Sequence, residues 1–116
     1  MKLFCFSGGN LTNTNIGRIL EEAVKAFKNG MHEKALNLLK EALDVAPDSL
    51  NVIMNLANLE HQLGHLEEAR KYAKRYLKKC ENWEMYDILS DYYYSLGKHT
   101  EALKYINKAL ALGYAK

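Results

Sequence analysis

The amino-acid sequence predicts an all-α protein made of three stacked helix-turn-helix units, and three observations lead to this fold class. A pattern of a glycine, polar residues and an alanine occurs three times, in "KNGMHEKA", "QLGHLEEA" and "SLGKHTEA". From Gly30 to Gly64 is 34 residues and from Gly64 to Gly97 is 33, a period typical of stacked supersecondary units. The 116 residues include one proline, the strongest helix breaker, so long stretches are free to be helical.

Each unit is expected to form two amphipathic helices separated by its glycine. In the first unit, Ile19, Ala23, Ala26 and Phe27 recur at helical spacing. Each glycine falls where a first helix must stop, because glycine accepts the left-handed conformation that ends helices. The spacing predicts helices over residues 16–29 and 32–45, 49–63 and 66–80, and 83–96 and 99–112.

These helices predict a single repeat domain. Its units are expected to span about 16–49, 50–82 and 83–116. Before them lies an extension, residues 1–15, that either packs on the first unit or is disordered. Pro47 closes the first unit, and Asp48 or Ser49 is suited to cap the next helix. The second unit has lost one residue, most simply around Lys79–Asn82, where a helix should end.

Small residues at the predicted helix crossings indicate close packing within each hairpin. Ala23 faces Ala35 in the first unit, and Ala57 faces Ala69 in the second. Larger side chains are expected to fill the space between successive hairpins, including Leu39, Tyr76 and Ile106. One hairpin cannot bury both its faces, whereas three stacked hairpins share a continuous core.

On these residues the chain resembles the tetratricopeptide repeat family, over residues 16–114. The family pattern runs bulky, Leu, small, aromatic, Gly, Ala, aromatic, Ala, Pro. The matching residues are Ala23, Gly30, Ala35, Ala42 and Pro47 in the first unit, Leu56, Ala57, Gly64 and Ala69 in the second, and Tyr86, Leu89, Tyr93, Gly97, Ala102 and Ala109 in the third. Glu81 and Tyr114 depart from the pattern, since the family usually has proline there, and so does Tyr76, where a small residue is usual.

The resemblance implies a right-handed superhelix whose first helices line a concave groove that binds a peptide segment of another protein. Carried over to this chain, the groove has an apolar end, a row of amides able to bond a peptide backbone, and an acidic end that suits a basic or amphipathic partner. The alternative is that these polar side chains are simply solvated and bind no partner. The expected groove residues are Leu20, Val24 and Phe27, then Asn51, Met54, Asn55, Asn58 and His61, and then Asp87, Asp91 and Tyr94.

One subclass of the family does not fit. Repeats that grip the C-terminal carboxylate of chaperones need lysine, arginine and asparagine at five positions. This chain has Leu20, Val24, Asn55, Glu84 and Ile88 there. Only Asn55 matches, and Glu84 would repel a carboxylate.

Composition and motifs disfavour most other classes. A net charge of +2 implies no global attraction to nucleic acid; the basic rows on residues 70–79, whose role the sequence leaves open, have no interleaved aromatic platform. No apolar run approaches the roughly 18 residues of a membrane span. His61 and His65 lack the neighbours of a metal site. Without a nucleophile–base pair or cofactor fingerprint, we expect no enzyme, cofactor or metal. The lone thiols Cys5 and Cys80 favour a cytoplasmic location.

A second hypothesis is self-association through the last helix. Apolar residues there extend beyond the stripe that should pack inward, and an exposed patch of this kind tends to mark an interaction site. The alternative is that a few apolar residues on an end helix are simply tolerated. The residues of this predicted edge are Leu103, Tyr105, Leu110 and Leu112.

Overall fold

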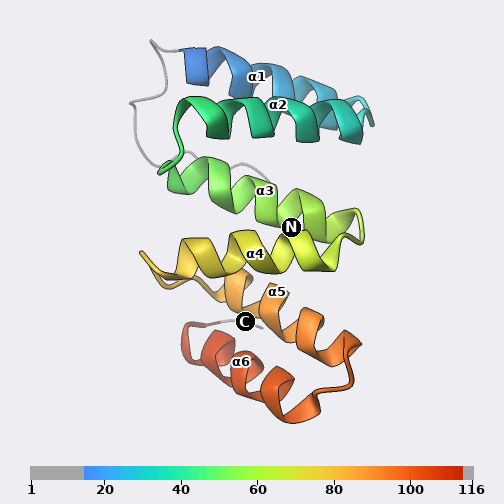
Figure 1. The fold of residues 1–116 in the computed structure, drawn as a ribbon, viewed down its shortest axis with the longest axis vertical. Helices are drawn as coiled ribbons and strands as arrows, with labels where there is room; N and C mark the ends of the chain where they lie inside the picture. Colours follow the sequence, from blue (N-terminus) through green and yellow to red (C-terminus); the bar gives the residue numbers. More distant parts are fainter. Residues whose placement is uncertain (1–14, 114–116) are drawn as a thin grey trace.

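The structure, a computed structural model, describes residues 15–113, with side chains from residue 16 onward. The expectations for residues 1–14, and for Tyr114, lie outside this range. The described part folds into six helices, which Figure 1 shows stacked in chain order along the long axis of the molecule. They are α1 (Asn15–Lys28), α2 (His32–Val45), α3 (Leu50–Gln62), α4 (Leu66–Leu77), α5 (Trp83–Ser95) and α6 (His99–Ala111).

The helix boundaries confirm the predicted hairpins to within one residue, except at the end of α4. That helix ends at Leu77 rather than at residue 80, because the chain turns there and the N–H groups of Lys79 and Cys80 both donate to the carbonyl of Tyr76. Asn82 then starts α5, its side chain accepting hydrogen bonds from the N–H groups of Glu84 (2.8 Å) and Met85 (3.2 Å). The shorter second unit is consistent with this tight connection.

Glycine ends each first helix in the same way. Gly30, Gly64 and Gly97 have φ angles of 77°, 83° and 77°, a region that residues with a Cβ adopt at a cost. The next residue then donates its N–H back to a carbonyl five residues earlier, as from His65 to Glu60 at 2.9 Å. This is the Schellman arrangement, which satisfies a carbonyl that the helix leaves without a partner.

The small residues predicted at the helix crossings lie in the core. Ala23, Ala35, Ala57 and Ala69 are completely buried. The central helix α3 contributes to two clusters of buried apolar side chains, one shared with α1 and α2 and the other with α4 and α5. The inter-unit residues Leu39 and Tyr76 are buried as predicted.

The helices define an inner and an outer face. The first helices α3 and α5 contact each other, whereas no two of the second helices α2, α4 and α6 do so. We call the side on which α3 and α5 meet the inner face, to which α1 is assigned by its repeat position because it contacts only α2. The outer face carries the second helices.

Candidate peptide-binding face

The middle of the inner face is formed by α3, and two of its three asparagines lie deep. Asn55 and Asn58 are 0% and 1% exposed. Neither the amide nitrogen nor the amide oxygen of Asn55 has a hydrogen-bond partner. Burying an amide without a partner costs about 1–3 kcal/mol by mutational measurements, and no protein group offsets that cost here.

The acidic end of the inner face links α3 to α5. The Nε2 atom of His61 lies 2.7 Å from the Oδ2 atom of Asp91, while Asp87 is half-buried one turn before Asp91 on α5. Burial raises the pKa of Asp87, and so does the nearby negative charge of Asp91, with His61 acting weakly in the opposite direction. A positively charged partner side chain between the two carboxylates would relieve this cost.

This cost predicts the pH dependence of an Asp87→Asn variant. Because the folded chain holds the Asp87 proton more tightly than the unfolded chain does, stability falls as pH rises past the ordinary value of 3.8 and Asp87 ionises. Asp87→Asn is therefore expected to raise the free energy of unfolding at pH 7, with the gain shrinking toward pH 3. Urea titrations of both proteins from pH 3 to pH 7 measure this, and a gain that grows toward low pH would contradict it.

The remaining predicted groove residues are placed differently from one another. Leu20 is completely buried and Met54 is 5% exposed, so both belong to the core rather than to an open surface. Val24, Phe27 and Asn51 are half-buried. Tyr94 is 64% exposed, with its ring edge-on to His99.

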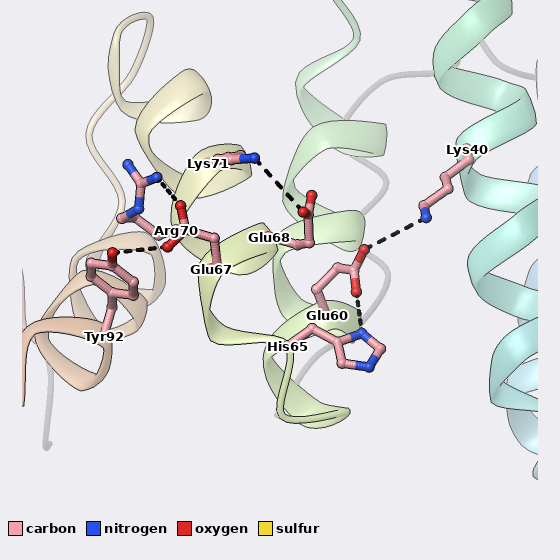
Figure 2. Close-up of polar contacts among 8 residues, drawn as sticks. All are labelled: Lys40, Glu60, His65, Glu67, Glu68, Arg70, Lys71 and Tyr92. Carbon is pink, nitrogen blue, oxygen red and sulfur yellow. Dashed lines mark hydrogen bonds and ion pairs between the residues drawn. The ribbon is translucent and has the colours of Figure 1, made fainter. Parts of the chain in front are cut away.

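Two of the six cations in residues 70–79 are neutralised by glutamates of their own helix, α4. Figure 2 shows Arg70 paired with Glu67, which also accepts a hydrogen bond from Tyr92 on α5 (2.8 Å). Lys71 lies 3.7 Å from Glu68. Tyr92 thus has a hydrogen-bond partner on the neighbouring helix α4.

Glu60 is a buried charge that the sequence analysis missed. It is 1% exposed, and its two oxygens face Lys40 of α2 (3.9 Å) and His65 (2.7 Å), as Figure 2 shows. The available signal was its repeat position, 34 residues after the buried Ala26 and 33 before the half-buried Tyr93. A carboxylate there needs cationic partners, and it ties the first unit to the second.

Three of the four residues predicted to form the self-association edge are exposed on α6 or directly after it. Leu103, Leu110 and Leu112 are 59%, 47% and 41% exposed. Tyr105 departs from this set, because its ring stacks on Tyr93 (5.6 Å between centroids) and on Tyr86 (6.2 Å). It lies against α5 and not on the exposed edge.

The described residues include no group of three or more histidine, cysteine, aspartate or glutamate side chains placed to hold a metal ion. His61 and His65 point to different acidic partners, Asp91 and Glu60. None of the six helices combines the length and apolar character that crossing a membrane requires.

Comparison with known proteins agrees with this architecture. Tetratricopeptide repeat models match residues 26–87 and 84–112. Over 85 residues the chain is 29% identical to a TPR repeat-containing protein of Methanocaldococcus jannaschii, covering 73% of this chain and 15% of that protein. Over 87 residues it is 31% identical to tetratricopeptide repeat protein 21A of Mus musculus, covering 72% of this chain and 7% of that one. The chain thus spans a small part of these relatives.

A solved structure of MamA (AMB-1) superposes with a TM-score of 0.74 at 22% identity, covering 88% of this chain and 61% of MamA. The likeness extends the agreement from sequence to the stacked-hairpin fold. Tetratricopeptide repeats generally mediate protein–protein interaction, and such domains are typically non-enzymatic scaffolds. On its repeat period, its hairpin geometry and these matches, the chain belongs to the tetratricopeptide repeat family.

Proposed function

We propose that the chain is a non-enzymatic scaffold whose inner face captures a basic or amphipathic peptide segment of another protein. The observation that carries this proposal is the pair Asp87 and Asp91 on α5, where two carboxylates lie near each other and burial opposes the charge of Asp87. Such a pair gains more from a bound cation than two fully solvated carboxylates do.

The centre of the inner face supplies the second element of recognition. The amide of Asn55 has a donor and an acceptor without partners, which is what a peptide N–H and C=O require. Because Asn55 is completely buried, a peptide reaches it only after the covering side chains move. Phe27 and Val24, both half-buried, offer apolar contact at the α1 end of the same face.

The test starts from a phage-displayed library of random twelve-residue peptides selected on the immobilised full chain. We expect an enriched group with lysine or arginine among apolar residues. A member of that group is then made synthetically, and its affinity is measured by fluorescence anisotropy. Micromolar binding, about −8 kcal/mol, is ordinary for such sites.

The variant for this test is Asp87→Asn with Asp91→Asn, and we expect it to bind the basic peptide about tenfold more weakly, as loss of charge-assisted contacts implies. A matched control is Glu41→Gln with Asp44→Asn, which removes the same charge from exposed positions of α2. Equal weakening in both variants, or no basic peptide among those selected, would refute the proposal.

A second candidate function is self-association through α6. Leu103 and Leu110 are 59% and 47% exposed and, seven residues apart, share one side of the helix. A symmetric dimer would bury such a patch. Sedimentation at increasing concentration tests this: the wild type should gain mass and a Leu103→Glu, Leu110→Glu variant should not, whereas a wild type of constant monomer mass rules it out.

A further inference from the structure

On the outer face, a cleft of about 280 Å³ opens between the second helices α4 and α6. These two helices do not contact each other, and both contact α5, which Figure 1 shows between them. We call this the outer cleft. It is lined by Lys74, Lys78 and Lys108, by Tyr86 and Tyr105, and by two leucines.

The outer cleft has an apolar interior and a basic rim. Tyr86 is 8% exposed and stacks on Tyr105, which is half-buried. The ammonium group of Lys108 lies 5.6 Å from the centre of the Tyr86 ring and 5.9 Å from that of Tyr105. Lys74, Lys78 and Lys108 are themselves exposed, so their charges surround the opening. The tyrosine rings and leucines form its base, where the Tyr86 hydroxyl donates to the Glu81 carboxylate at 3.2 Å.

The three rim amines have no acidic partner within the described residues. None of the three ammonium groups lies within 4.0 Å of a carboxylate oxygen, the limit for an ion pair. By contrast, Arg70 and Lys71 on α4 are each paired with a glutamate. The unneutralised positive charge of α4 is therefore gathered toward its C-terminal end, at the cleft.

The preceding pair of second helices, α2 and α4, provides an internal comparison at equivalent repeat positions. There Lys40 replaces Lys74, Asp44 replaces Lys78, and Arg75 replaces Lys108. Lys40 pairs with Glu60, and Arg75 donates to the carbonyl of Pro47 at 2.7 Å. The chain thus satisfies its own cations between α2 and α4 but leaves them without acidic partners between α4 and α6.

We propose that the outer cleft binds an acidic segment of a partner protein that carries an aromatic or large apolar side chain. The three amines complement carboxylates at the rim, and the tyrosine and leucine base accommodates the apolar side chain. A nucleic-acid backbone fits less well, because it rewards cations spread along a track, whereas Arg70 and Lys71 further along α4 are already paired with glutamates. This surface lies opposite the proposed inner-face site and does not depend on it.

The probe is a synthetic eight-residue peptide with the core Asp-Glu-Phe-Asp-Glu, titrated into the ¹⁵N-labelled full chain and followed by NMR chemical shifts. We expect saturable shifts at residues 74–78 and at the amides of Tyr86, Tyr105 and Lys108. Peptides with the core Asn-Gln-Phe-Asn-Gln or Asp-Glu-Gly-Asp-Glu should bind more weakly, because each lacks one of the two recognised features.

The variant Lys74→Gln with Lys108→Gln should weaken binding about tenfold, as loss of charge-assisted contacts implies. The control Lys25→Gln with Lys34→Gln removes two exposed lysines elsewhere and should leave it unchanged, as should Asp87→Asn with Asp91→Asn, which separates this site from the inner face.

Four results would overturn the proposal: no saturable shift up to about 1 mM peptide, a range that covers weak sites; shifts confined to the inner face; equal weakening in the control; or tighter binding of an eight-nucleotide oligo-dT at the same residues. A fifth result would also overturn it. If the chain self-associates at millimolar concentration and thereby displaces the peptide, the cleft binds a second copy of the chain instead.

Discussion

Replacing Leu56 by alanine is expected to lower the free energy of unfolding by about 2–5 kcal/mol, the range for deleting a fully buried leucine side chain. Leu56 is completely buried on α3, within the cluster that joins the first unit to the second. A loss of this size is a large fraction of the roughly 5–15 kcal/mol that stabilises a typical domain. Urea denaturation followed by circular dichroism at 222 nm measures it.

The matched control is Leu103→Ala on α6, which removes the same atoms from a side chain that is 59% exposed. Its effect should stay within about 0.5 kcal/mol, as for surface substitutions in general. If Leu56→Ala were as mild as Leu103→Ala, the central packing described for α3 would be wrong.

Replacing Asn55 by leucine is expected to act in opposite directions on stability and on binding. Leucine has the same number of side-chain heavy atoms and the same branching as asparagine, and it removes a buried amide that has no partner, so the free energy of unfolding should rise by about 1–3 kcal/mol. The same change removes the donor and acceptor proposed to bond the peptide backbone. Affinity for the selected basic peptide should therefore fall, by about tenfold if two such bonds are lost.

The control for this variant is Asn107→Leu at an exposed position of α6, where neither stability nor affinity should change appreciably. A destabilised Asn55→Leu chain would show that the amide has a structural partner. A stabilised chain with unchanged affinity would show that the amide plays no part in peptide capture.

The hairpins and most helix boundaries followed from sequence because they depend on local signals. Glycine at positive φ and alanine at the crossings repeat with a fixed period, and each unit reinforces the assignment of the others. The end of α4 did not follow, since the periodic pattern continues to residue 80 while the helix stops at Leu77. What ends it is a turn held by the carbonyl of Tyr76 together with the Asn82 cap on the next helix.

The sequence predicted on which side of a helix each candidate site residue lies, but not whether that residue is exposed. Helical periodicity places Asn55, Asp87 and Asp91 on one side of their helices, whereas burial depends on neighbouring units. It therefore could not show that Asn55 and Leu20 are completely covered. Likewise, the sequence places Tyr105 on an exposed edge, and the structure does not. Its stacking with Tyr86 and Tyr93 arises only when α5 and α6 pack together, which the pattern of one helix cannot show. The periodicity of one helix does not predict which side chains of a neighbouring helix will contact it.

The central claim is that the inner face captures a peptide, and the side-chain NH₂ resonance of Asn55 reports on it most directly. The ¹⁵N-labelled chain is titrated with the selected basic peptide, and Asn55→Leu identifies the Asn55 signal by its absence. The account predicts that this signal shifts with saturation, together with shifts at His61, Asp87 and Asp91. Shifts confined to α2, α4 and α6, with the Asn55 signal unmoved, would contradict it.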